Sequence, residues 1–154
     1  MPKGDFYTLR HEATISTAIT FLQAKAGTSY GFCIREFGIG KRADATSEQI
    51  AIALVRKSSA ATVTTAAIGT HLFKHDPGGP DPNLSLGTAA TGVIGSAEGS
   101  DSDIICKIPF NLVSGLIYQP LREIEVAVSG IIALKFLEAP TSRTFLAWMV
   151  IEEN

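Results

Sequence analysis

The stretch RTFLAWMVIEE, Arg143–Glu153, decides the fold class of this chain. Its apolar side chains form two interleaved sets. One set is Phe145, Ala147, Met149 and Ile151, and the other is Leu146, Trp148 and Val150. Because successive side chains of an extended strand point to opposite faces, this spacing predicts a β-strand rather than a helix. We expect Trp148 in the core, with an exposed aromatic binding platform as the alternative.

Similar runs recur along the chain, rich in β-branched residues and separated by Gly, Pro, Ser and Asp. They occupy residues 12–25, 30–39, 49–58, 61–69, 103–111, 114–120, 122–130 and 130–138. This pattern predicts an all-β chain. We expect a single jelly-roll-like domain over residues 1–154, a two-sheet sandwich of roughly eight strands with one long loop. An immunoglobulin-type sandwich is the alternative. The core is expected to contain Ile52, Leu54, Ile105, Ile124, Val126, Ile132, Leu134, Phe136 and Trp148.

A segment of different composition interrupts these runs. The sequence HDPGGPDPN at His75–Asn83 holds three prolines and two glycines. Neither a helix nor a central strand passes through such a segment, because proline lacks an N–H and fixes φ. The alternation of apolar and polar residues stays weak as far as Asp103, so we predict a long loop over about residues 71–103. Loops of this length are usually functional or disordered. We expect that replacing Pro77–Ser96 with a short linker would leave the fold intact.

The composition excludes several classes of protein. The net charge of −2 gives no electrostatic basis for binding nucleic acid or a membrane surface. No apolar run approaches the roughly 20 residues that span a bilayer, and the first residues lack a secretory signal, so we expect a soluble protein made in the cytoplasm. Charged residues make up 18%, below the usual share of about 25%, which favours burial against partner chains.

Motifs that would carry chemistry are weak. His71 and His75 have a spacing that suits a metal on a helix, but their neighbours favour a loop or strand end. The stretch GIGKRAD at 38–44 lacks the spacing of a phosphate-binding loop and indicates a strand that ends in a basic hairpin. The three histidines, His11, His71 and His75, form no pattern that argues for a hydrolase triad. We therefore predict no catalytic residue, no metal site and no cofactor.

Two further pairs of residues have structural interpretations. Cys33 and Cys106 lie in alternating apolar runs, so we expect buried thiols that act as small hydrophobic groups. Glu152 and Glu153 are interpreted as a solvated terminus rather than as an acid–base pair.

Several short stretches of the sequence resemble those of a known family. LVRKSSAATVT at 54–64 is followed by LGTAATGVIGSAEG at 86–99, then by SGLIYQP, GIIALKF and APTSRTFLAWMVIEE. This order resembles the jelly-roll head decoration, or cement, proteins of tailed bacteriophages, from Gln49 to the end of the chain. The resemblance implies a homotrimer on the outer capsid surface of a virion that clamps major capsid subunits and stabilises the head. It implies no catalytic residues.

With that resemblance, the long loop and a short N-terminal arm, about residues 1–12, are expected to contact other chains. The candidate interface residues are Phe6, Tyr7, His71, His75, Asp76, Pro77, Pro80, Asp81 and Pro82. The first alternative is a carbohydrate- or receptor-binding jelly roll, in which Trp148, Tyr118 or the loop stacks on sugar. A cupin-like enzyme is a further alternative, but it needs more inward histidines than this chain offers.

Overall fold

The computed structural model describes residues 4–42 and 47–153, which form strands and no helix. No helix in that part is long and apolar enough to cross a membrane. The strands are β1 (Asp5–Ile15), β2 (Thr20–Lys25), β3 (Phe32–Lys41), β4 (Gln49–Ser59), β5 (Thr62–Thr65), β6 (Leu72–Lys74), β7 (Gly92–Ala97), β8 (Ser100–Asn111), β9 (Leu116–Tyr118), β10 (Ile124–Val126), β11 (Ile131–Phe136) and β12 (Arg143–Glu153). The predicted all-β class is confirmed, with twelve strands in place of roughly eight.

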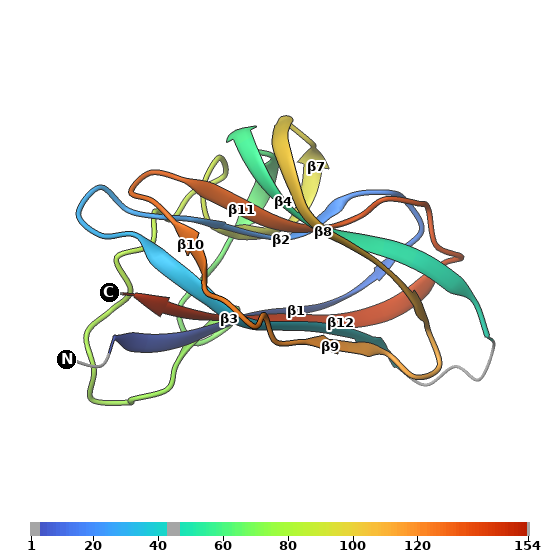
Figure 1. The fold of residues 1–154 in the computed structure, drawn as a ribbon, viewed down its shortest axis with the longest axis horizontal. Helices are drawn as coiled ribbons and strands as arrows, with labels where there is room; N and C mark the ends of the chain where they lie inside the picture. Colours follow the sequence, from blue (N-terminus) through green and yellow to red (C-terminus); the bar gives the residue numbers. More distant parts are fainter. Residues whose placement is uncertain (1–3, 43–46, 154) are drawn as a thin grey trace.

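The strands build two antiparallel sheets that face each other, as Figure 1 shows. Sheet 1 has the order β10-β3-β12-β1-β6, and β9 also pairs with β3. Sheet 2 has the order β5-β7-β2-β11-β4-β8. The pairing is nested and alternates between the sheets: β1 pairs with β12, β2 with β11, β3 with β9 and β10, and β4 with β8. This is the jelly-roll arrangement.

The segment between β4 and β8 adds strands to both sheets. Strands β5 and β7 extend sheet 2 beyond β2, and β6 extends sheet 1 beyond β1. These additions move one open edge of each sheet from β1 and β2 to the short strands β6 and β5, which offer fewer unpaired N–H and C=O groups. The predicted loop at 71–103 therefore needs correction. It contains β6, β7 and the start of β8, and its longest stretch between strands is residues 75–91.

The N-terminal segment also differs from the prediction. Asp5–Ile15 is not an arm but strand β1, which pairs with β12 along its whole length, from Asp5 opposite Glu153 to Ile15 opposite Arg143. Residues 1–3 of the expected arm lie outside the described residues. The alternation Tyr7, Leu9, His11 places these side chains toward the core, as in any half-buried strand.

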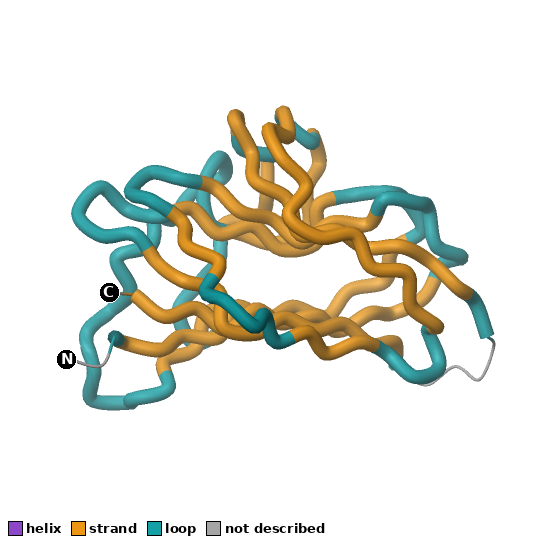
Figure 2. The backbone as a smooth tube through the Cα atoms, viewed as in Figure 1, coloured by secondary structure: helices purple, strands orange, loops and turns teal. Residues whose placement is uncertain are grey.

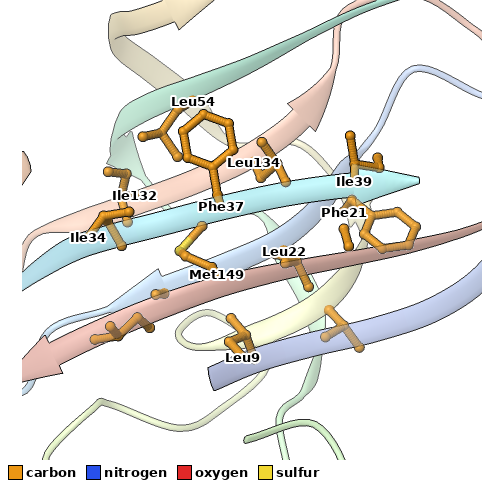
Figure 3. Packing of buried hydrophobic residues seen from close by; sticks show 14 of the residues in the cluster. Leu9, Phe21, Leu22, Ile34, Phe37, Ile39, Leu54, Ile132, Leu134 and Met149 are labelled. Carbon is orange, nitrogen blue, oxygen red and sulfur yellow. The ribbon is translucent and has the colours of Figure 1, made fainter. Parts of the chain in front are cut away.

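The core lies between the two sheets (Figure 3). Of the predicted core residues, seven are buried: Ile52, Leu54, Ile124, Val126, Ile132, Leu134 and Phe136. Ile105 is only partly buried. Trp148 is not in this core, because β12 turns Phe145, Ala147, Met149 and Ile151 inward and so places Trp148 on the outer face of sheet 1.

Candidate functional site

Most of the predicted interface residues meet at one end of the sandwich, where residues 75–82 run past the start of β1. We call this segment the His75–Pro82 loop. The backbone N–H of His75 donates to the carbonyl oxygen of Phe6 at 2.9 Å, and the two rings stack with their centroids 5.9 Å apart. The His75 ring also bonds to the Thr8 hydroxyl at 2.7 Å. The loop is thus attached to β1 at its first residue.

The rest of the loop is held by polar contacts. Tyr7 is buried, and its hydroxyl donates to the carbonyl oxygen of Pro80 at 3.1 Å. The Lys74 ammonium group lies 2.5 Å from Asp81 and donates to the Gly79 carbonyl at 3.1 Å. The Asp76 side chain accepts the N–H of Gly78 at 2.9 Å and closes a tight turn. The side chains left exposed are those of His75, Asp76, Pro77, Pro80 and Asp81.

Beyond Pro82 the chain crosses from sheet 1 to sheet 2 beside both termini (Figure 2). The N–H of Asn83 donates to the Glu153 carboxylate at 2.9 Å, and the N–H of Ser85 donates to the Lys25 carbonyl on β2 at 2.9 Å. Leu84, between them, is buried. Asn83 packs closely against Gly27. A Cβ atom at position 27 would lie 1.9 Å from the carbonyl oxygen of Asn83. The segment therefore closes this end of the sandwich.

Acidic groups gather at this closure and change the pKa of two side chains. Burial, together with Glu153, Asp5 and Asp81, raises the pKa of Tyr7 to about 12. Burial also raises the pKa of Glu153, which the nearby Asp5 reinforces. The interpretation of Glu152 and Glu153 as a solvated terminus is wrong. Glu153 holds Asn83, and Glu152, only 8% exposed, forms an ion pair with Arg35.

Replacing Tyr7 with Phe is expected to lower the unfolding free energy by about 1 kcal/mol at neutral pH, because the Pro80 carbonyl loses its donor. Because the folded-state pKa of Tyr7 is raised from 10.0 to about 12, folding favours the neutral phenol. The parent should therefore lose stability as pH rises from about 10 toward 12, and Tyr7→Phe should lose less. Urea unfolding at pH 7, 10 and 11.5 measures this. Equal pH dependence in the two proteins would contradict the assignment.

His71 does not join the other predicted interface residues. It lies before β6, and its ring contacts that of His11 with centroids 5.2 Å apart. The pKa of His11 is lowered, first by burial and then by His71. His71 and His75 flank the extended strand β6, so at about 3.3 Å per residue they stand about 13 Å apart along it and do not share a metal.

A second cluster of polar groups lies at the other edge of sheet 1. Atoms of Cys33, Glu123 and Glu125 that are able to ligate a metal lie within 4.8 Å of one another. The Cys33 Sγ is 3.7 Å from Glu123. Arg35, however, already binds Glu123 at 2.6 Å and also pairs with Glu152. A metal would have to displace this guanidinium group, so the cluster is better described as an ion-paired edge. Cys33 is buried as predicted, whereas Cys106, on sheet 2, is only half-buried.

Sequence reasoning missed Lys74, Asn83 and Glu153, which fix the His75–Pro82 loop and the residues that follow it. Their roles depend on contacts between residues as many as 70 positions apart, such as Asn83 with Glu153, and no local pattern marks them. The stretch GIGKR is strand β3 and its end, as predicted, while Ala43 and Asp44 lie outside the described residues. No family model matches the chain, and no curated protein or solved structure matches it significantly.

Proposed function

We propose that this protein is an outer capsid decoration protein of a tailed bacteriophage, which forms a trimer and stabilises the head by binding major capsid subunits. The sequence resemblance supports this proposal, and so does the jelly-roll topology. The observation that carries it is the His75–Pro82 loop. Its exposed side chains are held in place before any partner binds, by Phe6, Tyr7 and Lys74. Such preorganisation reduces the entropy lost on association.

Apolar side chains on a second surface support an assembly role. Val113, Ile117 and Leu121 lie on the connection from β8 to β10, and they are 59%, 65% and 104% exposed. Large apolar side chains that gather on the surface often mark sites of protein contact. A trimer that also binds the shell needs two separate contact regions, and we assign this surface and the His75–Pro82 loop to them.

The proposal is tested with one loop variant and one control. Sedimentation equilibrium at micromolar concentration should report a trimer, and the protein should co-sediment with capsids assembled from the major capsid protein of the same phage genome. Pro77→Glu places a charge on the exposed loop and should weaken trimer formation or capsid binding at least tenfold. Thr88→Glu, exposed farther along the same connection, should change neither.

One outcome would overturn the proposal, and another would remove the His75–Pro82 loop from it. A parent protein that is strictly monomeric and does not co-sediment with capsids contradicts the assembly role itself. A Pro77→Glu variant that assembles and decorates as tightly as the parent keeps the assembly role but removes the His75–Pro82 loop from it.

A further inference from the structure

All three histidines of the chain lie close to the place where strand β6 meets strand β1. His71 directly precedes β6 and His75 directly follows it, while His11 lies on β1 and contacts His71. Histidine is the only side chain whose ordinary pKa gives a change of charge between about pH 5 and 8. The attachment of β6 to β1 is therefore the part of this fold where mild acid adds charge.

Strand β6 is short, and the residues at its ends contribute to its attachment. It spans Leu72–Lys74, and its partner strand in the described residues is β1, at the edge of sheet 1. One further backbone hydrogen bond lies at each end. The N–H of Arg10 donates to the carbonyl oxygen of His71 at 2.8 Å, and the N–H of His75 donates to that of Phe6 at 2.9 Å. A change at His71 therefore acts directly on one end of this strand.

The ring of His71 closes the turn that leads into β6. Its Nδ1 accepts the backbone N–H of Ala67 at 3.2 Å. The Ala67 carbonyl oxygen in turn accepts the N–H groups of residues 70–72. An imidazole nitrogen accepts a hydrogen bond only while it carries no proton, and both nitrogens of the charged ring are donors. The bond from Ala67 to His71 is therefore lost when His71 takes up a proton.

His11 and His71 also lie close enough for like charges to repel. Their rings meet edge to face, with centroids 5.2 Å apart. The His11 ring also packs against the Phe21 ring of β2, with centroids 6.0 Å apart. Burial lowers the pKa of His11, and His71 lowers it further. The fold therefore favours the neutral form of the His11 ring.

The charged groups around this pair do not neutralise it. Glu12 raises the pKa of His11, but as the smallest of the three causes, and it is already paired with Arg42. Arg10, whose N–H bonds to the carbonyl of His71, adds a positive charge. On the facing strands, β2 contributes an apolar ring and β12 places an alanine opposite His11. A second positive charge at this place therefore meets repulsion.

His75, at the other end of β6, lies in a different environment. Its Nε2 is 2.7 Å from the Thr8 hydroxyl oxygen, and its ring stacks on Phe6. A protonated imidazole still donates to a hydroxyl group. The next residue is Asp76, and the nearby Lys74 is paired with Asp81. Protonation of His75 therefore breaks no contact, and this residue supplies the matched control.

We propose that His11 and His71 form a pH-sensitive contact that holds β6 to β1 at neutral pH and releases it at about pH 5–6. Protonation removes the bond from Ala67 to His71 and makes the two rings repel. The turn at residues 66–71 and β6 then separate from β1, which exposes the edge of β1 and frees the start of the His75–Pro82 loop. Strand β1 stays in sheet 1 through its pairing with β12. This inference does not depend on the decoration role.

The direction of the effect distinguishes this contact from other titrating groups. A histidine whose pKa is lower in the folded state stabilises the fold above the ordinary value of 6.5, and that stabilisation is lost as pH falls through the folded-state pKa. The raised pKa of Glu153 acts in the opposite sense, because that carboxyl group favours folding more as it takes up a proton. The lowered pKa values of Glu36 and Asp101 act as pH falls through their ordinary values of 4.5 and 3.8.

Amide hydrogen exchange followed by NMR on the full chain tests the proposal. In the parent, the protection factors of the Arg10 and Ala67 amides should fall at least tenfold between pH 7.5 and pH 5, while amides bonded between β1 and β12 stay protected. The double variant His11→Phe/His71→Asn keeps an aromatic ring on β1 and an acceptor for Ala67, and neither side chain takes up a proton. Its protection factors should agree within twofold at the two pH values. The control His75→Gln should behave like the parent.

Titration of the imidazole Cε1–H signals gives a second measurement. The midpoint of the His11 signal should rise in His71→Asn, because the neighbouring charge is gone, and should stay unchanged in His75→Gln. The proposal is overturned if the parent protects Arg10 and Ala67 equally at pH 7.5 and pH 5, or if the double variant loses protection as the parent does. Equal loss of protection between β1 and β12 also overturns it, because the whole sheet then opens rather than β6.

Discussion

Replacing Pro77–Ser96 with a short Gly-Ser linker is expected to abolish cooperative folding, contrary to the expectation from sequence. The replaced segment holds Leu84, Ala90 and Val93, all of which are buried. It also holds most of β7, the strand that joins β2 to β5 in sheet 2. Full burial of a large apolar side chain contributes about 1.5–3 kcal/mol. Losing several of them together approaches the whole stability of a domain, about 5–15 kcal/mol.

The same replacement would remove the shorter of two hydrogen bonds that the amide nitrogen of a buried glutamine donates. Gln23 on β2 is fully buried, and its amide nitrogen donates to the carbonyl of Ala90 at 2.6 Å. Its amide oxygen accepts the N–H of Ala61 at 2.9 Å. Without the segment, the Ala90 acceptor is gone and Ala61 is no longer held over β2. Each unpaired buried group costs about 1–3 kcal/mol.

Far-UV circular dichroism and urea unfolding measure this effect. We expect no cooperative transition for the linker variant and a single sharp one for the parent. Replacing only the exposed Pro77 and Gly78 with serine is the matched control, and it should change the unfolding free energy by less than about 1 kcal/mol. A linker variant that unfolds cooperatively near the parent midpoint would show that residues 75–91 are a surface addition after all.

The strands that sequence predicts well are those with one apolar face. In REIEVAV, Ile124 and Val126 alternate with the exposed Glu125, and the structure buries the two apolar side chains. In RTFLAWMVIEE both sets of alternating side chains are apolar, so periodicity alone does not say which set faces the core. The predicted core position of Trp148 is wrong for that reason. The face of sheet 1 on which sheet 2 packs decides it, and that face carries Phe145, Ala147, Met149 and Ile151.

The elements that sequence missed have either a polar outer face or a distorted backbone. Residues 5–12 belong to β1 and alternate in burial, although they fall within the arm predicted over about residues 1–12. Strand β7 contains Gly92 and Gly95 and bends at Ile94, whose φ of 51° is unusual for a β-branched residue. A Cβ at position 92 would lie 2.3 Å from the Thr64 carbonyl oxygen, so β5 approaches closely only because that residue is glycine. The side chains of such a distorted strand do not alternate regularly between its two faces, so its sequence shows no period-2 pattern.

A buried lysine ties the turn between β7 and β8 to sheet 2, and no local sequence pattern marks it. Lys57 on β4 is 6% exposed. Its ammonium group lies 2.8 Å from Asp101 and donates to the Glu98 carbonyl at 2.7 Å. Lys135 on β11 binds the second oxygen of Asp101 at 2.8 Å. The Glu98 carboxylate accepts both the N–H and the hydroxyl of Thr20, each at 2.7 Å.

The charges of this network determine how it responds to acid. Burial raises the pKa of Asp101, but hydrogen bonds from Lys135 and Lys57 and their positive charges outweigh it, so the pKa lies below its ordinary value of 3.8. A carboxyl group whose pKa is lower in the folded state stabilises the fold above its unfolded pKa. That stabilisation is lost as pH falls below about 4 and Asp101 takes up a proton.

Replacing Lys57 with Met is expected to lower the unfolding free energy by about 2–4 kcal/mol at pH 7, because Asp101 and the Glu98 carbonyl lose a buried partner. The expected loss is near the lower end of the cost of breaking a buried ion pair, because Lys135 still binds Asp101.

The control is Lys107→Ala, which removes an exposed lysine on β8 and should change the unfolding free energy by less than about 0.5 kcal/mol. Urea unfolding at pH 7 and pH 3 measures both. The difference between parent and Lys57→Met should shrink at pH 3, because the unfolded chain takes up a proton at Asp101 below about pH 4 and the ion pair then favours folding less. A Lys57→Met variant as stable as the parent at pH 7 would show that the apolar methionine replaces the ion pair without loss and that the network does not hold the β7–β8 turn.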